Sequence, residues 1–283
     1  MPELPEVETI AREAHERVRG DRIVEVWFSG HREPFKTPPA RQTRGLAGRA
    51  ILAIHRTGKH IVCELGGPAD GSLLVESVGK SAAQWIVHLG MTGRLLVTTP
   101  DAPVAVHTHA RLRLMSGREL RFVDPRRFGR LEYRDLSRRA SFRAPGADPL
   151  GVTAAEFARL FHGRKLAIKA ALLNQKLLSG VGNIYADESL FRAGIRPRRQ
   201  SGRLSRAELE ELRRALVEVL EHAIRLGGSS VSDYVDASGE RGFFQLEHCV
   251  YQRTGLPCRL CQTPIRRILV AGRRTHYCPQ CQR

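Results

Sequence analysis

The first residues of the chain have the chemistry of a nucleophilic site. The sequence begins MPELPE, and an initiator methionine that precedes a small residue is usually removed. The Pro2 nitrogen would then be a secondary amine, which is partly neutral near pH 7 and can attack a sugar carbon. Glu3 and Glu6 lie within one helical turn of that amine, where a carboxyl group could move protons during imine formation. The same residues also fit an ordinary helix start with acids at its positive end.

A second group of reactive side chains lies at the other end of the chain. Four of the six cysteines form two Cys-x-x-Cys pairs with sixteen residues between them: Cys258, Cys261, Cys278 and Cys281. This spacing predicts one structural Zn²⁺ per chain, held by four thiolates at about 2.3 Å with no open position for water. The other two cysteines, Cys63 and Cys249, lie in apolar stretches and are predicted to be small buried hydrophobic residues.

The charge of the chain favours a polyanionic partner. Lys and Arg number 46 against 29 Asp and Glu, a formal net charge of +17, and nucleic acid is the first candidate. A protein from an organism with a generally basic proteome, or a ribosome-associated protein, would have a similar charge. No apolar stretch approaches the roughly 18 residues of a membrane span, and the N-terminus has no signal-peptide pattern. We therefore expect no membrane association and a cytoplasmic, nucleoid-associated location.

These residues need a scaffold, which the sequence predicts to be α+β. Apolar residues recur at helical spacing from Val7 to Val18, so a helix follows the N-terminus. Between residues 23 and 133 many short apolar runs separated by Gly and Pro predict an antiparallel sandwich or barrel. Helical patterning then takes over. Its clearest element runs from Ser205 to Leu226, with a capping box at Ser205 and Glu208 and a stop at Gly227.

Five ordered motifs resemble those of formamidopyrimidine-DNA glycosylases. The opening PELPEVET at 2–9 closely resembles the start of that family, and the likeness continues along nearly the whole chain in family order. The other motifs are GKH at 58–60, HLGMTG at 88–93, DPRRFG at 124–129 and the run 174–191, before the cysteine hairpin. The resemblance implies an N-terminal helix plus β-sandwich, a helix-two-turn-helix domain and a C-terminal zinc-ribbon-like β-hairpin.

The resemblance also implies catalytic roles. Pro2 matches the residue that forms the Schiff base, Glu3 matches the proton donor, and Lys59 matches a hairpin lysine that assists β-elimination. Taken alone, Lys59 would be an ordinary solvated lysine in a turn. Arg273 matches the arginine that grips the lesion phosphates and is linked with δ-elimination, although its neighbour Arg274 is a plausible rival.

Further positions match the family's DNA contacts. Met91, Arg126 and Phe128 match residues that fill the void left by an extruded base, and their chemistry suits wedging between base steps and bonding the orphaned partner base. Asn183, in the glycine-bearing turn at 178–188, is expected to face a phosphate near a helix N-terminus, although a plain helix-helix turn has the same pattern. The remaining expected DNA contacts are Lys169, Arg164 and His107.

The expected organisation follows from these assignments. We predict a catalytic β-sandwich domain at 1–136, a linker at 137–150, a helix-two-turn-helix domain at 151–228, a lesion-recognition loop region at 229–250 and a zinc finger at 251–283. The expected partner is damaged double-stranded DNA, and the expected oligomeric state is a monomer.

The predicted function is removal of oxidised purines such as 8-oxoguanine and formamidopyrimidines in base-excision repair, followed by β,δ-elimination. The purine branch is favoured because residues 227–230, Asp233-Tyr234 and 242–245 resemble the segment that closes over 8-oxoguanine. Departures from the family pattern are Ser229-Ser230 in place of a threonine pair, His276 in place of an aromatic, and a long stretch at 66–83.

Three alternatives stay open at this point. An endonuclease VIII-like glycosylase for oxidised pyrimidines shares the same architecture. A non-catalytic damaged-DNA-binding protein could keep the scaffold without the chemistry, although Pro2, Glu3 and Lys59 are all retained. A zinc-ribbon RNA-binding protein would explain the charge and the cysteines but not the N-terminal motif.

Overall fold

The computed structural model describes residues 1–67, 81–231 and 234–283 of the chain. These residues form two compact units, the first comprising 1–143 and 229–242 and the second 144–228 and 243–283. The chain thus returns to the first unit after residue 228, so the segment 229–250 is divided between the two. Asp233 and residues 68–80 of the long stretch lie outside the described residues. Within the described ranges, no helix has the length and apolar character to cross a membrane.

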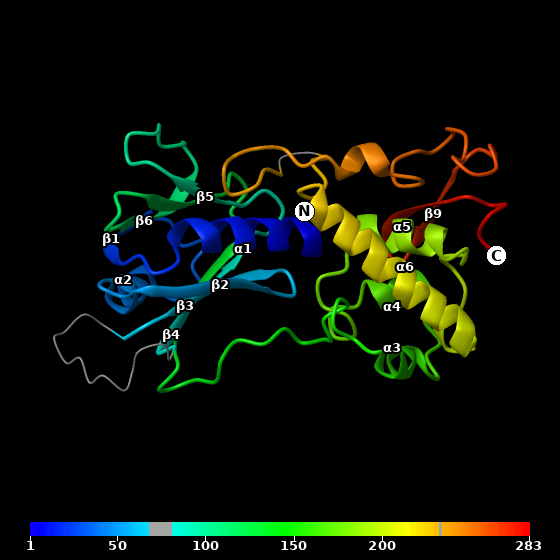
Figure 1. Ribbon diagram of the computed structural model, residues 1–283, viewed down its shortest axis with the longest axis horizontal. Helices are drawn as coiled ribbons and strands as arrows, with labels where there is room; N and C mark the ends of the chain where they lie inside the picture. Colours follow the sequence, from blue (N-terminus) through cyan, green and yellow to red (C-terminus); the bar gives the residue numbers. More distant parts are fainter. Residues whose placement is uncertain (68–80, 232–233) are drawn as a thin grey trace. The chain divides into compact units, whose positions relative to one another are not determined.

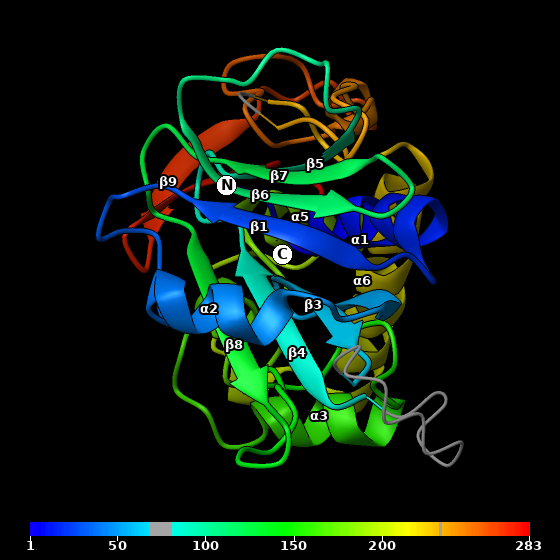
Figure 2. The same ribbon diagram turned by 90° about the vertical axis from the view of Figure 1, so that its left-hand side faces the viewer.

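The first unit contains two four-stranded antiparallel sheets (Figure 2). One sheet has the order β1-β6-β7-β5, formed by Ile23–Phe28, Thr108–Leu114, Glu119–Val123 and Arg94–Thr98. The other has the order β2-β3-β4-β8, formed by Ile51–Thr57, His60–Leu65, Ala83–His88 and Arg130–Asp135. Both sheets and helix α1 (Leu4–Val18) contribute buried residues to one hydrophobic core, and α2 (Pro39–Leu46) adds Leu46. The predicted leading helix and β-sandwich are confirmed.

Helix α1 is amphipathic in the way that its sequence predicts. Its apolar stripe from Val7 to Val18 is buried, and the helix runs beside β2 (Figure 1). The ring nitrogen of His15 accepts the amide hydrogen of Ile54 at 3.0 Å. Glu8 accepts a hydrogen bond from Arg56 at 2.7 Å, and the Arg56 side chain is only 5% exposed. Because this ion pair is shielded from water, it ties the first turns of α1 to the end of β2 more firmly than an exposed pair would.

Segment 229–242 is hydrogen-bonded to the same helix. The Ser229 amide donates to Glu6 at 2.8 Å, and the Ala237 amide donates to Glu13 at 3.0 Å. The Tyr234 hydroxyl donates to the Glu6 carbonyl at 3.5 Å. Burial, together with the nearby Glu6 charge, raises the pKa of Tyr234, so this phenol stays protonated and can donate. These contacts join residues more than 200 positions apart in sequence.

The second unit is mainly helical. Its helices are α3 (Ala154–Phe161), α4 (Ile168–Leu172), α5 (Asn183–Arg192) and α6 (Arg206–Arg225), with short 3-10 helices η2 (Ser201–Arg203) and η3 (Phe244–Glu247). The predicted capping box is present at α6, since the Glu208 amide donates to Ser205 and the Ser205 amide donates to Glu208. Helix α6 packs against α3 and α5 (Figure 1). Its apolar stripe is therefore core, as the sequence predicts.

A β-hairpin completes the second unit. Strands β9 (Arg266–Val270) and β10 (Arg273–Tyr277) pair antiparallel across a turn at Ala271 and Gly272, where both residues have positive φ as tight hairpin turns require. The segment leading to this hairpin is anchored on Glu188, whose carboxylate accepts the amides of residues 249, 250 and 251 at 2.8 to 3.0 Å. Burial raises the pKa of Glu188.

The contribution of the core to the first unit can be tested with the two tryptophans of the chain. Trp85 is 1% exposed and donates its ring N–H to Gln42 at 3.1 Å, whereas Trp27 is 44% exposed. Trp85→Ala should lower the free energy of unfolding by about 3 to 5 kcal/mol because it leaves a cavity. Trp27→Ala should change it by about 0.5 kcal/mol at most. Urea unfolding followed by circular dichroism measures both, and equal losses would contradict the assignment of Trp85 to the core.

Candidate active site and DNA-binding surface

Pro2 and Glu3 lie directly before the first turn of α1. Met1 is 53% exposed, whereas Glu3 and Glu6 are 3% and 2% exposed. The Glu3 amide donates to one Glu6 carboxylate oxygen at 2.8 Å, and the Ser229 amide donates to the other, also at 2.8 Å. Glu6 is therefore occupied in holding the chain start against segment 229–242. The Glu3 side chain in turn accepts the Glu6 amide, which completes a capping box at the start of α1.

Lys59 occupies the turn between β2 and β3, as the sequence predicts. The turn needs Gly58, whose φ of +62° lies in the left-handed region. Arg56 donates to the Gly58 carbonyl at 3.4 Å and also pairs with Glu8 of α1. The hairpin tip that carries Lys59 is thus connected through Arg56 to the helix that follows Pro2 and Glu3.

His88, at the end of β4, is a functional candidate that the sequence reasoning did not single out. Burial lowers the pKa of His88 first, and the nearby positive charges of Lys59 and Arg130 lower it further. Strand pairing places His60 opposite His88, with ring centroids 4.8 Å apart, and burial with this neighbour lowers the pKa of His60 to about 4. His88 therefore adds a hydrogen-bonding imidazole beside the Lys59 charge. Only the strand register reveals this proximity.

The structure brings Met91, Arg126 and Phe128 together on two adjoining loops. Buried Asp124 accepts the Thr92 hydroxyl at 2.6 Å and the Gly129 amide at 2.8 Å, so it links the β4–β5 loop to the β7–β8 loop. Gly90 has a φ of +64°, and a Cβ there would lie 2.5 Å from the main chain of Phe128. Only glycine permits this close approach of the loops.

The side chains at these loop tips face solvent. Met91 is 41% exposed and Phe128 is 49% exposed. The Arg126 guanidinium lies 4.6 Å from the centre of the Phe128 ring, which is within cation–π range. Exposed His107 lies close by, because its carbonyl accepts the Asp124 amide at 2.9 Å. Exposed apolar tips beside a guanidinium have the composition expected of residues that enter a base stack.

In the second unit, Asn183 is the first residue of α5 and Arg164 is exposed in the loop after α3. Gly180, with a φ of +104°, shapes the turn before α5. The Asn183 amide nitrogen donates to the Arg274 carbonyl at 3.0 Å, so this turn lies against strand β10. The helix N-terminus and the basic hairpin are consequently neighbours within one unit.

Lys169 has a different environment from the one expected of a phosphate contact. It is fully buried, and its ammonium group pairs with buried Asp187 at 2.7 Å. The same group donates to the Thr275 hydroxyl at 2.8 Å and to the Arg274 carbonyl at 3.2 Å. Asp187 also accepts the His276 amide at 2.9 Å. Lys169 thereby joins α4 and α5 to β10, and a phosphate contact would require it to leave this ion pair.

Arg273 and Arg274 are both exposed on β10. Successive residues of a strand point to opposite faces, so the two arginines serve different sides of the hairpin. The main chain of Arg274 is held by Lys169 and Asn183, as described above. The helical part of the unit thus holds the backbone of this strand, whereas the side chains of Arg273 and Arg274 extend into solvent.

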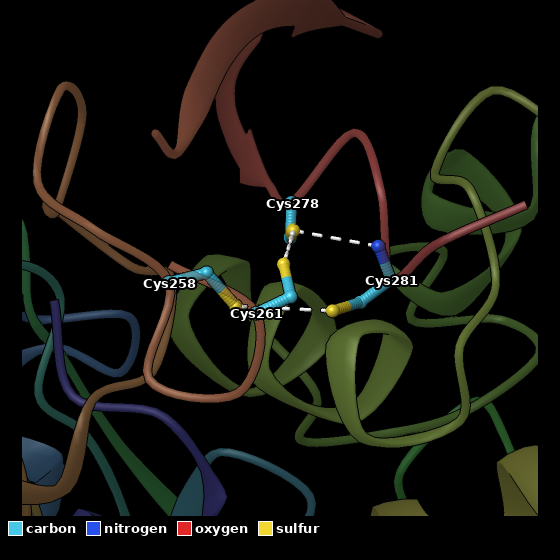
Figure 3. A group of neighbouring side chains, drawn as sticks. All are labelled: Cys258, Cys261, Cys278 and Cys281. Carbon is cyan, nitrogen blue, oxygen red and sulfur yellow. Dashed lines mark hydrogen bonds between the residues drawn. The ribbon is translucent and has the colours of Figure 1, made fainter. Parts of the chain in front are cut away.

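The four cysteines of the two Cys-x-x-Cys pairs converge at the base of the hairpin (Figure 3). Their sulfur atoms all lie within 4.8 Å of one another, with 3.4 Å between Cys261 and Cys278 and 3.9 Å between Cys258 and Cys281. Tetrahedral zinc–thiolate geometry needs about 3.8 Å between sulfurs. The Leu260 amide donates to the Cys258 sulfur and the Cys281 amide donates to the Cys278 sulfur, both at 3.4 Å. The donor set fits one structural zinc ion, whose role would be to hold the hairpin on its unit.

The other two cysteines differ from each other. Cys63 is 1% exposed, and burial raises the pKa of its thiol to about 12, so it is the buried hydrophobic residue that the sequence predicts. Cys249 is only partly buried, so that prediction was wrong for its side chain. The reason is that the Cys249 side chain packs only at the edge of the cluster that contains Phe191 and Val250, so part of it faces solvent.

Comparisons with known proteins cover the whole chain. Family models match for the formamidopyrimidine-DNA glycosylase N-terminal domain (residues 1–131), the formamidopyrimidine-DNA glycosylase H2TH domain (145–235) and the zinc finger found in FPG and IleRS (255–283). A formamidopyrimidine-DNA glycosylase of Solibacter usitatus is 46% identical over 283 residues, covering 100% of both chains.

Solved structures give the same result. A mutant of the Lactococcus lactis FPG in complex with Fapy-dG-containing DNA has a TM-score of 0.84 at 32% identity, with 100% of both chains covered. A MutM complex with DNA containing carbocyclic 8-oxo-G has a TM-score of 0.85 at 33% identity, again with 100% of both chains covered. The two-sheet unit, the helical unit and the four-cysteine hairpin, with these matches, define a DNA-repair glycosylase. The chain belongs to the formamidopyrimidine-DNA glycosylase family.

Removal of one cysteine of the four-sulfur cluster tests whether this cluster binds the zinc ion. Cys258→Ser should reduce bound zinc from one ion per chain towards zero, because three thiolates hold zinc much less well than four. Elemental analysis of the purified protein measures the metal content. Cys249→Ser is the matched control, because Cys249 lies outside the four-sulfur cluster. Full zinc content in Cys258→Ser would show that another residue completes the site.

The internal role of Lys169 leads to a stability prediction. Lys169→Ala should lower the free energy of unfolding by about 3 to 5 kcal/mol, because it leaves the Asp187 carboxylate buried without its partner. Lys176→Ala, at an exposed position, should be nearly neutral. Denaturant unfolding followed by circular dichroism measures both. Unchanged stability with strongly weakened DNA binding would instead support Lys169 as a direct phosphate contact.

Proposed function

We propose that this glycosylase removes oxidised purines through the Pro2 amine, once Met1 has been removed, and then cleaves the strand. The observation that carries the proposal is the place of Pro2 and Glu3 before α1, with Glu6 engaged by two backbone amides. Glu3 directly follows Pro2 in sequence and is the acid that we assign to the amine. The positive end of α1 also disfavours protonation of that amine, which keeps part of it nucleophilic at neutral pH.

The chemical steps follow from these groups. The Pro2 nitrogen attacks C1′ of the damaged nucleotide, and the base leaves with the electron pair of the glycosidic bond. Glu3 protonates the ribose ring oxygen as the ring opens, so that an iminium ion forms between Pro2 and C1′. The iminium acidifies C2′. Loss of a C2′ proton expels the 3′ phosphate with assistance from Lys59, and a second elimination with Arg273 expels the 5′ phosphate.

DNA recognition in this proposal uses the exposed residues of both units. Met91 and Phe128 fill the void of the extruded nucleotide, and Arg126 bonds the orphaned partner base. The phosphate contacts are assigned to His107, Arg164, Asn183 and, if it leaves Asp187, Lys169. The hairpin contributes a cationic surface, and the zinc ion keeps that surface in place without acting as a Lewis acid.

The substrate class is the oxidised purine branch. Support comes from the family name of the relatives and from the likeness to structures whose bound DNA contains Fapy-dG and carbocyclic 8-oxo-G. The enzyme acts as a monomer, since one chain carries the nucleophile, the acid and the zinc hairpin. It works in the cytoplasm on nucleoid DNA, as its net charge of +17 favours.

The test is borohydride trapping of the purified protein on duplexes that carry either 8-oxoguanine or an oxidised pyrimidine. Borohydride reduces the imine to a stable amine, and mass spectrometry then maps the attachment site. We expect a cross-link at Pro2 that forms faster on the purine lesion. A form that retains Met1 should give no adduct at Pro2, because its nitrogen is then a peptide amide. Pro2→Gly leaves a primary amine and should slow adduct formation.

Each other outcome has a definite meaning. Faster trapping on the pyrimidine would transfer the enzyme to the endonuclease VIII-like branch. Attachment at Lys59 rather than Pro2 would overturn the assignment of the nucleophile. Tight binding to damaged DNA without any adduct would show a protein that recognises damage but does not catalyse its removal.

A further inference from the structure

A cavity of about 560 Å³ opens in the first unit, and the residues that line it are distant from Pro2 in sequence. Its walls come from Trp27 of β1 and residues 29–31 after it, from residues 106–109 around the start of β6, and from Pro125 and Arg127 of the β7–β8 loop. Strands β1 and β6 are hydrogen-bonded neighbours (Figure 2). The volume lies in the range of small-ligand pockets, about 300 to 1,000 Å³.

The floor of this cavity is rigid. His109 is 3% exposed and uses both ring nitrogens internally, towards the Ser29 hydroxyl at 3.0 Å and the Asp124 carbonyl at 3.1 Å. Asp124 is the same buried residue that links the two loops of Met91 and Phe128. The cavity and those loops are therefore parts of one connected framework, and the polar groups of the floor have no need of an outside partner.

The rim is cationic. None of the residues that line the cavity is acidic, whereas Arg127, His31 and His107 are exposed around it. Among the residues that the structure describes, Arg127 forms no ion pair. Burial lowers the pKa of His109, so this ring adds no positive charge to the site. An anion placed at this rim would meet the charge of Arg127, with the imidazoles of His31 and His107 as hydrogen-bonding neighbours.

The backbone of Arg127 is bent in a way that separates two neighbouring arginines. Its φ of +54° lies in the left-handed region, which residues other than glycine adopt rarely. The Arg127 amide is held by the Asp124 carbonyl at 3.2 Å. As a result Arg126 stacks on Phe128, whereas Arg127 lines the cavity.

One wall of the cavity is apolar and open to solvent. Trp27 is 44% exposed and Val106 is 93% exposed. A cationic rim beside an exposed indole is the combination with which proteins hold a phosphate and the nucleoside attached to it, because every base and sugar offers an apolar face for stacking.

We propose that this cavity is an additional DNA subsite, which takes one nucleotide of the duplex outside the lesion. Arg127, His31 and His107 hold its phosphate, and Trp27 packs against its sugar and base. The subsite rests on the proposed function, because His107, Arg126 and Phe128 are assigned there to DNA. Arg127, His31 and Trp27 are the residues that it adds to that surface. It extends the bound length of DNA beyond the damaged nucleotide, on the side of the β7–β8 loop.

Trp27 itself provides the measurement. The chain has two tryptophans, and Trp85 is already shielded at 1% exposure, so acrylamide quenching of tryptophan fluorescence reports mainly on Trp27. The probe is a lesion-containing duplex at saturation, with saturation checked independently by gel shift. We expect the quenching constant to fall several-fold in the complex. Shortening the duplex from one end, nucleotide by nucleotide, should restore quenching at a defined length.

A variant tests the phosphate contact separately. Arg127→Ala should weaken binding about tenfold, as expected for loss of a charge-assisted contact, and should reduce the slope of log K against log salt concentration by about 1. Arg138→Ala is the matched control, because its side chain is 78% exposed and makes only a 3.9 Å contact with Asp135. The control should leave the affinity within about twofold.

The outcomes distinguish the subsite from the proposed function. If DNA binds and the Pro2 adduct forms, but Trp27 stays equally quenchable and Arg127→Ala keeps the full salt slope, the subsite is wrong and the catalytic proposal stands. If Trp27 is protected while no adduct forms, the subsite stands and the catalytic proposal is wrong. If no lesion duplex binds at all, both are overturned.

Discussion

The arrangement of the N-terminal end of the first unit depends on the Glu6 carboxylate. Its two oxygens accept the amides of Glu3 and Ser229, both at 2.8 Å, in a position that is 2% exposed. Charge-assisted hydrogen bonds in such a shielded place are among the stronger polar contacts in proteins. Through them one side chain sets the path of the N-terminus and secures a segment that returns from the far part of the chain. In our proposal Glu3, which directly follows Pro2 in sequence, is the acid for the chemistry.

A second buried carboxylate organises the part of the first unit assigned to DNA. Asp124 holds Thr92 and the Gly129 amide, and its own main chain holds His107, His109 and Arg127. The exposed tips of Met91 and Phe128 and the cavity beside Trp27 all surround this residue. Because a buried carboxylate must have its oxygens satisfied, the loops around Asp124 are constrained to one arrangement, and the side chains that extend from them are presented ready for a ligand.

Local patterns were sufficient to predict most of the scaffold. The α1 stripe from Val7 to Val18, the capping box at Ser205 and the short strands of the first unit depend on neighbours within a few residues, so their periodicity is visible in the chain. The zinc-binding Cys-x-x-Cys pairs were predictable for the same reason. Residues such as Lys169 were not, because a lysine on a helix has the same local pattern whether its ammonium group meets solvent or a buried Asp187. The partial exposure of Cys249 was not predictable either, because it depends on packing against residues distant in sequence, such as Phe191.

The sequence by itself determined the class of chemistry, the order of the elements and the metal ligands, since these follow from residue types and short spacings. Tertiary structure decided which groups act together. It made Glu6 a structural residue, placed His88 beside Lys59, used Lys169 to support β10, and directed Arg126 and Arg127 to different neighbours. The physical reason is that burial and hydrogen-bond partners are properties of the packed chain, where residues more than 200 positions apart meet at the same carboxylate.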